Sequence, residues 1–163
     1  MPLNYANLAN EFESAWKAKN PSEMVTAIKE AKAISAFIDS GITAMGGVPT
    51  SAPMIPVLAN ELAGMWQSKL PNEDLVGKQE AKAIHGMIMG TMTAGGKHGV
   101  GGFMSGSPAG LANELASLYK QHLPAESLAA IKKAKAIDSY VKSCIFRGSG
   151  VGPDYIPDIS SLS

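Results

Sequence analysis

A threefold internal repeat constrains this chain of 163 residues more than any other feature. The tetrapeptide Leu-Ala-Asn-Glu occurs three times, beginning at Leu8, Leu58 and Leu111. Eight residues after each of these leucines comes an aromatic residue, which is Trp16, Trp66 or Tyr119. A proline follows thirteen residues after each leucine, and Ala-Lys-Ala-Ile begins 23 residues after it, without a gap in any copy. The chain is therefore built from three copies of one unit.

The spacing of apolar residues in each unit predicts two helices joined by a turn. In the third copy Leu111, Leu115 and Leu118 follow the i, i+4, i+7 spacing of one helix face. The second half of each unit also carries apolar residues three or four positions apart. The internal proline, Pro21 in the first copy, marks the start of the second helix, with Asn20 as its expected cap. These patterns predict an all-α fold of three tandem helical hairpins, six helices in total.

Long Gly/Pro-rich segments separate the predicted hairpins. The three hairpins are expected at residues 1–40, 57–90 and 108–146. Two arms are expected at 41–56 and 91–107, and an extended C-terminal tail at 147–163. Connections of this length inside a compact domain are usually functional or disordered, so we expect these segments to take part in contacts.

The arms and the tail carry large apolar side chains on their glycine-rich backbone. The residues expected to bind partners are Met45, Met54, Ile55, Phe103, Met104, Tyr155, Ile156 and Ile159. Such segments order against a surface, which is either the helices of the same chain or a neighbouring subunit. The sequence leaves these two possibilities open.

Charged and aromatic residues recur at fixed positions of the repeat. If each unit reverses at its proline, the repeated Glu faces the repeated Lys, which pairs Glu11 with Lys32, Glu61 with Lys82, and Glu114 with Lys135. The alternative is that both residues are simply solvated, because an exposed ion pair contributes only ~0–1 kcal/mol. The recurring aromatic residues are more typical of core or inter-helix anchors than of a ligand-binding box.

Motifs for catalysis or metal binding are missing from the sequence. The Gly-rich stretch around Lys97 lacks the Gly and the Ser or Thr that a phosphate-binding loop requires. His85, His98 and His122 do not have metal-ligand spacing, and Cys144 has no identifiable partner base. We therefore expect no enzymatic activity, no cofactor and no metal site.

Composition narrows the possible partners. The chain has 14 Lys+Arg and 14 Asp+Glu, whereas a general nucleic-acid binder normally has a basic face. Its apolar stretches fall short of the ~20 residues that span a bilayer, and no leader segment is visible, which indicates synthesis in the cytoplasm. Only 17% of the residues are charged, so much of the surface is expected to contact protein subunits. Nucleic acid, membrane and small molecules are not expected as partners.

The third copy of the repeat is similar in sequence to a pattern in a known class of proteins. The stretch SPAGLANEL at 107–115, followed by Tyr119, Pro124 and an Ala-rich second half, resembles a pattern in small virion structural proteins of tailed bacteriophages. The resemblance implies a non-enzymatic component of the tail, baseplate, neck or capsid that joins neighbouring subunits of an assembly in the virion. The alternative is a helical-repeat adaptor that binds a peptide or protein partner in a cellular complex.

Overall fold

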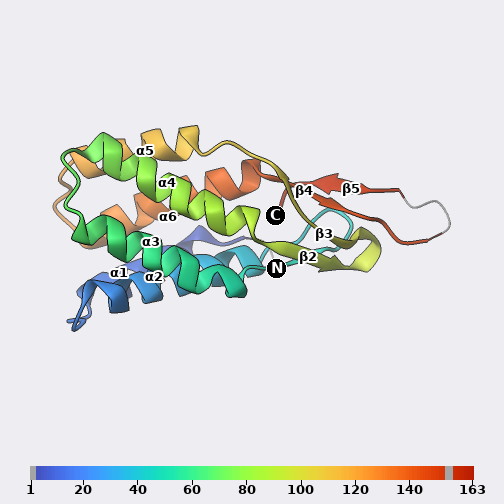
Figure 1. Cartoon of the computed structure of the whole chain (residues 1–163), viewed down its shortest axis with the longest axis horizontal. Helices are drawn as coiled ribbons and strands as arrows, with labels where there is room; N and C mark the ends of the chain where they lie inside the picture. The colour runs from blue at the N-terminus through green and yellow to red at the C-terminus, as the bar shows by residue number, and fades with distance from the viewer. Residues whose placement is uncertain (1–2, 153–155) are drawn as a thin grey trace.

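Six helices form the body of the molecule. The computed structural model describes residues 3–152 and 156–163. The helices are α1 (Tyr5–Lys17), α2 (Glu23–Asp39), α3 (Ile55–Gln67), α4 (Glu73–Met89), α5 (Ala109–Lys120) and α6 (Glu126–Ser143). Successive pairs form three hairpins, one for each copy of the repeat (Figure 1).

The second helix of the first hairpin begins later than expected. Ser22 is its N-cap, and its side chain accepts a hydrogen bond from the Val25 backbone N–H. The assignment of Asn20 as the cap was therefore wrong. Asn20 instead donates from Nδ2 to the Ala15 carbonyl oxygen and to Thr26 Oγ1, at 2.9 and 2.8 Å. Its amide joins the end of α1 to the beginning of α2, which fixes the turn between them.

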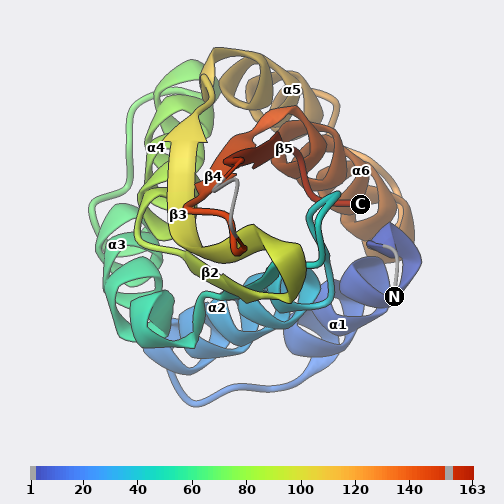
Figure 2. The same ribbon diagram turned by 90° about the vertical axis from the view of Figure 1, so that its right-hand side faces the viewer.

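The six helices close into a ring (Figure 2). Each helix packs against the next one along the chain, and α6 returns to pack against α1. The ring surrounds a core of leucines, isoleucines and alanines from all three copies, including Leu8, Leu58, Leu111, Ile34, Ile84 and Ile137. The three hairpins therefore share one hydrophobic core, so each depends on the other two for burial.

The glycine-rich arms form a five-stranded antiparallel sheet, so the prediction of an all-α fold was wrong. The strands are β1 (Val48–Thr50), β2 (Met92–Gly95), β3 (Gly99–Ser105), β4 (Ile145–Gly148) and β5 (Asp158–Ser160), in the order β1-β2-β3-β4-β5. Glycine is depleted in β-strands, so a glycine-rich segment does not predict a strand. Here it permits close strand pairing, since a Cβ at Gly101 would overlap the Arg147 carbonyl oxygen.

The hairpins explain why neighbouring strands are antiparallel. The α3–α4 hairpin lies between β1 and β2, and the α5–α6 hairpin lies between β3 and β4. A helical hairpin returns the chain to the end it left, so the strands on either side of it run in opposite directions. The sheet consequently gathers at one end of the ring, and the helix turns lie at the other end (Figure 1).

Close packing between α4 and α5 gives a stability prediction. A Cβ at Gly77 would lie 2.7 Å from the Ala112 carbonyl oxygen and from the Ala116 backbone nitrogen, whereas Gly86 in the same helix has open space. We expect Gly77→Ala to lower the free energy of unfolding by about 1–3 kcal/mol. The control Gly86→Ala should raise it by roughly 0.5–1 kcal/mol through helix propensity. Urea unfolding of both variants tests this, and equal effects would contradict the close packing.

Candidate functional site

Three charged residues meet on the axis of the helix ring. Glu30, Glu80 and Lys133 each directly precede the Ala-Lys-Ala-Ile sequence of their repeat. They therefore occupy one equivalent position on α2, α4 and α6, and each is at most 2% exposed. Ring closure brings these equivalent positions together. We call the three residues the axial triad.

The axial triad is linked by ion pairs and hydrogen bonds. Lys133 Nζ lies 2.7 Å from Glu30 Oε2 and 2.5 Å from Glu80 Oε1. Trp16 Nε1 donates a hydrogen bond to Glu30 Oε1 at 2.5 Å, and the Tyr119 hydroxyl donates to Glu80 Oε2. One ammonium group thus joins the second helices of all three hairpins, and two of the recurring aromatic residues orient the carboxylates.

The electrostatics of the axial triad keep Lys133 charged. Burial disfavours the ammonium form, but the carboxylates of Glu30 and Glu80 outweigh burial and raise the pKa of Lys133 well above its ordinary value. Burial, together with the nearby Glu80, raises the pKa of Tyr119, so its hydroxyl remains a donor. The contribution of Lys133 to stability is present below about pH 10 and is lost only as the pH rises through its raised pKa.

A cavity adjoins the axial triad at the end of the ring where the helices turn. Its volume is about 350 Å³. It is lined by Trp16, Glu23, Thr26, Glu30, Trp66, Val76, Tyr119 and Lys133. All three recurring aromatic residues are thus half-buried core residues that also form the wall of a cavity. We call this space the axial cavity.

A second polar centre lies inside the sheet, around His98. His98 is fully buried, and its Nδ1 is 2.8 Å from Asp158 Oδ2 while its Nε2 is 2.6 Å from Thr93 Oγ1. A Cβ at Gly47 or Gly148 would overlap the imidazole ring, so these two glycines make room for it. The sequence did not indicate this position, because His98 lies within a glycine-rich stretch and its partners are distant along the chain.

The hydroxyl, imidazole and carboxylate of this centre have the order found in nucleophilic hydrolases. However, Thr93 is 1% exposed, His98 0% and Asp158 3%. A substrate cannot reach a hydroxyl that is buried to this degree. The three side chains instead join β2, β5 and the turn between β2 and β3, which is a structural role.

The carboxylate of this centre gives a prediction for acid stability. Burial disfavours the charged form of Asp158, but donors from Thr43, His98, Ser160 and the Met45 backbone outweigh it and lower its pKa from 3.8 to about 2. Because the pKa of Asp158 is lower in the folded chain than in the unfolded chain, the ionised carboxylate stabilises the fold at any pH above the unfolded pKa of about 4. This stabilisation is lost as the pH falls from about 4 to 2.

We expect Asp158 to account for a loss of about 2 kcal/mol over that interval. The measurement is the free energy of unfolding at pH 7, 4 and 2 for the wild-type chain and Asp158→Asn. The difference between the two should shrink as the pH falls. A difference that stays constant from pH 4 to pH 2 would show that Asp158 does not titrate as described.

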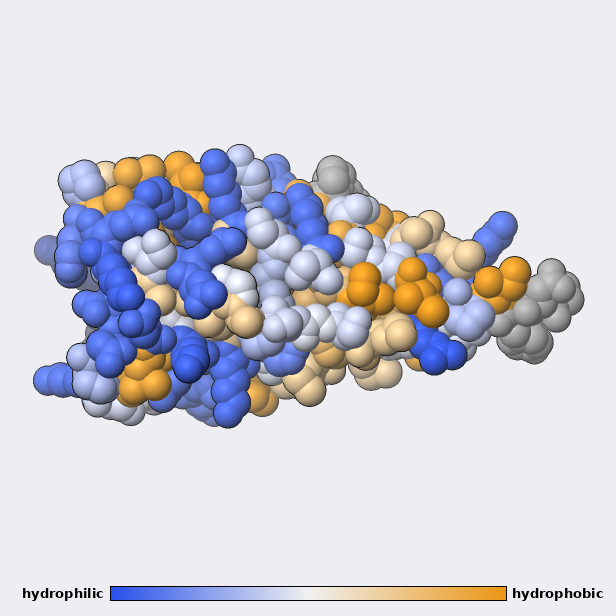
Figure 3. Space-filling model, turned by 90° about the horizontal axis from the view of Figure 1, so that it is seen from above, coloured by the Kyte–Doolittle hydropathy of each residue, from blue (hydrophilic) through white to orange (hydrophobic). Residues whose placement is uncertain are grey.

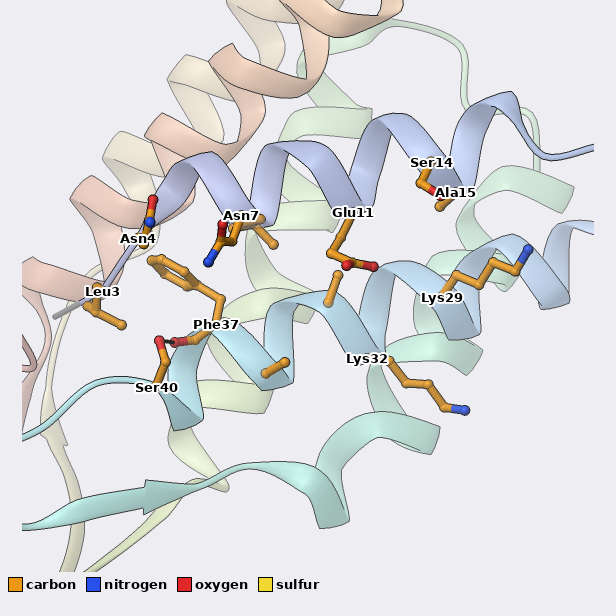
Figure 4. A pocket seen from close by; sticks show the side chains of 13 residues that line it. Leu3, Asn4, Asn7, Glu11, Ser14, Ala15, Lys29, Lys32, Phe37 and Ser40 are labelled. Atoms are coloured by element: carbon orange, nitrogen blue, oxygen red, sulfur yellow. Dashed lines mark hydrogen bonds between the residues drawn. The ribbon is translucent and has the colours of Figure 1, made fainter. Parts of the chain in front are cut away.

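The repeated Glu and Lys residues lie on the outer surface of the ring. Glu11 and Lys32 line a groove of about 840 Å³ between α1 and α2, in which Glu11 points towards α2 and Lys32 extends away from α1 (Figure 4). Glu114 and Lys135 line the equivalent groove between α5 and α6.

Glu11 lines one groove with Lys32 and Glu114 lines another with Lys135, but within residues 3–152 and 156–163 these residues do not form ion pairs with each other, and neither do Glu61 and Lys82. Lys135 instead lies over the Tyr5 ring, 5.4 Å from its centroid, which links α6 to α1.

The residues expected to bind partners fall into two groups. Met54, Ile55 and Phe103 pack against the core, and Phe103 contacts Phe146 edge-on. Met45 is half-buried, and its carbonyl oxygen accepts hydrogen bonds from the Lys97 and His98 backbone N–H groups. By contrast, Met104, Ile156 and Ile159 are exposed. Tyr155 lies outside the described residues.

Exposed apolar side chains gather at the sheet end of the molecule (Figure 3). They are Val48, Met92, Val100, Met104, Val151, Ile156 and Ile159, between 48 and 62% exposed, and we call them the apolar end. The strand register aligns Val48, Ala94 and Val100 in one outward row, and Met92, Gly102, Arg147 and Ile159 in the next. In the second row Gly102 and the exposed Arg147 separate Met92 from Ile159. Exposed apolar side chains that gather at one end of a molecule usually mark contact sites.

The other candidate reactive groups are packed within the fold. Cys144 is buried, its thiol contacts the Tyr140 carbonyl oxygen, and burial raises its pKa. His85 contacts the Tyr140 hydroxyl, and burial lowers the pKa of His85. In the part of the chain that the structure describes, three or more potential metal ligands do not cluster. The helices of this same part are too short or too polar to cross a membrane.

Comparison with known proteins gives no relative. No family model matches the chain, and no curated protein or solved structure is significantly similar to it. Function must therefore be inferred from the axial triad, the axial cavity, the hairpin grooves and the apolar end.

The sequence contains a signal for the axial triad that its helical periodicity alone does not reveal. Glu30 lies on the same helix face as Ala27 and Ile34, both buried, and Glu80 lies on the equivalent face of α4. A charge at a repeated inward position, with its sign reversed in the third copy, indicates a buried ion pair between copies. The repeat alone could have suggested this contact.

Proposed function

We propose that this protein is a non-enzymatic assembly protein that joins neighbouring protein subunits through its apolar end. The observation that carries the proposal is the position of seven large apolar side chains, 48 to 62% exposed, on the sheet and its adjoining loop. Exposing such residues side by side is unfavourable in water unless a partner covers them. The closed helix ring supplies a rigid body that holds this surface in place.

The test is the mass of the purified chain in solution as its concentration rises. The double variant Val100→Lys/Ile159→Lys places two charges on the apolar end, and we expect it to remain a monomer where the wild-type chain associates. Leu128→Lys/Ile131→Lys is the control, because these two residues are 40% exposed apolar residues on α6. It should associate as the wild-type chain does. A wild-type monomer at all concentrations, or equal effects of both variants, would overturn the proposal.

The proposed setting is a bacteriophage virion. It is supported by the resemblance of the SPAGLANEL stretch and the residues after it to small virion structural proteins. Mass spectrometry of density-banded particles from a lysate that expresses this chain tests the setting. Recovery of the chain with particles, at a fixed ratio to the major capsid subunit, is the expected result. Recovery only in the particle-free fraction would contradict it.

The hairpin grooves favour a second function, which is that of an adaptor. Two grooves, of about 840 and 420 Å³, lie at equivalent repeat positions, and each contains an exposed Glu and Lys. Repeated grooves suit an extended peptide or repeated elements of one partner. The variants Glu11→Ala and Glu114→Ala should weaken partner binding if the adaptor function is correct, and should leave self-association unchanged.

A further inference from the structure

We propose that the axial cavity is a binding site for an alkylammonium cation. The site goes beyond the assembly function, because it lies at the opposite end of the ring from the apolar end. It also differs from the expectation that the chain binds no small molecule. The walls, the charge and the volume of the cavity support this site.

The walls of the axial cavity suit an organic cation. Trp16, Trp66 and Tyr119 come from the ends of α1, α3 and α5, one from each hairpin. The faces of aromatic rings attract ammonium groups, most strongly when the cation is removed from water. The chain already shows this preference, since Lys133 Nζ lies 5.5 Å from the centroid of the Trp16 ring and 5.0 Å from that of Phe12.

The charges around the axial cavity favour a cation as well. Glu23 and Glu30 line it together with a single cationic group, Lys133. Glu80 lies behind Lys133 and adds a third carboxylate. Both oxygens of Glu80 already have partners, since Oε1 is ion-paired with Lys133 and Oε2 accepts a hydrogen bond from the Tyr119 hydroxyl. Lys133 therefore leaves an excess of negative charge, part of it buried, which one further cation would reduce.

The volume of the axial cavity sets the size of the ligand. A volume of about 350 Å³ lies at the lower end of the range for small-molecule sites. Val76 and the aromatic rings supply an apolar wall for a short alkyl chain. The ammonium group would lie nearest Glu30, whose two oxygens already accept hydrogen bonds from Trp16 and Lys133 and have lone pairs left.

Intrinsic fluorescence reports directly on this site, because both tryptophans of the chain line the cavity. The probe is n-butylammonium chloride, titrated into the full chain while tryptophan emission is recorded. Potassium chloride at equal ionic strength and n-butanol are the controls for salt and for the alkyl chain. We expect a saturable change with n-butylammonium alone. An equal response to potassium chloride or n-butanol, or no response, would overturn the proposal.

Variants locate the binding site. Glu30→Gln keeps the volume of the side chain and an acceptor for Trp16, and should weaken n-butylammonium binding at least about tenfold. Glu61→Gln, an exposed carboxylate on α3, should bind as the wild-type chain does. If Glu30→Gln does not fold, Glu23→Gln on the rim replaces it, with an expected loss of about threefold. Unchanged affinity in the folded cavity variant would overturn the proposal.

Two further titrations identify the natural source of the ammonium group. A short peptide with one lysine should bind, and its acetyl-lysine counterpart should not, if a protein side chain is the ligand. Free n-butylammonium should bind much more tightly than the peptide if the ligand is a small amine. Both results support a cation site. Equal binding of lysine and acetyl-lysine peptides, together with no binding of n-butylammonium, would contradict it.

Discussion

Replacing Lys133 by methionine is expected to lower the free energy of unfolding by about 3–5 kcal/mol. The substitution leaves Glu30 and Glu80 buried at 2% and 1% exposure without their shared counter-ion. For a chain of this length the loss corresponds to a fall in Tm of roughly 10 °C. Calorimetry measures both quantities. Lys132→Met is the control, because Lys132 is exposed on the same helix, and its effect should stay within about 0.5 kcal/mol.

A triple variant separates the charge of Lys133 from its packing. Adding Glu30→Gln and Glu80→Gln to Lys133→Met removes both buried negative charges that lack a counter-ion, and it keeps hydrogen-bond acceptors for Trp16 and Tyr119. Most of the lost stability should return, because replacing a buried ion cluster by neutral groups is often close to neutral. If it does not return, the loss in Lys133→Met comes from the contacts of the lysine side chain with Phe12 and Trp16.

The second large effect is expected at His98. His98→Phe replaces the imidazole by an aromatic ring that cannot form hydrogen bonds. The change removes the contacts with Thr93 and Asp158 and leaves a buried carboxylate without this donor. We expect a loss of about 3 kcal/mol in the free energy of unfolding. His122→Asn is the control, since His122 is exposed with a left-handed backbone that Asn tolerates.

A double-mutant cycle tests whether the unpaired carboxylate of Asp158 causes the loss of stability in His98→Phe. Asp158→Asn should cost clearly less in the His98→Phe background than in the wild-type chain, with a coupling of about 1 kcal/mol or more. Additive effects would show that His98 acts through its volume between Gly47 and Gly148 instead. The free energies come from urea unfolding followed by circular dichroism.

The two polar centres each join distant parts of the chain, one within the helix ring and the other within the sheet. The axial triad links the second helices of the three hairpins, while His98 and Asp158 link distant strands. Both centres are fully desolvated, so each is sensitive to the loss of a single partner. This leaves the outer surfaces, which are the apolar end and the hairpin grooves, free to change without loss of the fold.

The helical part of the fold could be predicted because its signals are local. Leu8, Phe12 and Ala15 follow one helix face within α1, and the same spacing recurs in the other copies. The sheet could not be predicted in this way. β1 and β2 are separated by a whole hairpin, and residues such as Gly101 carry no side chain whose alternation would indicate a strand.

The candidate site was only partly visible in the sequence. Trp16, Trp66 and Tyr119 recur at one position of the repeat, and in the structure they are half-buried against the core. Their second role, as the wall of a cavity, depends on ring closure. The repeat places Glu30 on an inward helix face, but its partner Lys133 is 103 residues away along the chain, so only the tertiary structure identifies the contact.

By itself the sequence determined that three similar helical hairpins form, because periodicity and repeat length act within about 32 residues. The tertiary structure decided how the hairpins meet. Closure of the ring by α6 and α1 brings three equivalent positions onto one axis, where Lys133 pairs with both Glu30 and Glu80 away from water. It also decided that the arms pair with each other, because backbone hydrogen bonding joins strands from distant parts of the chain without requiring side chains.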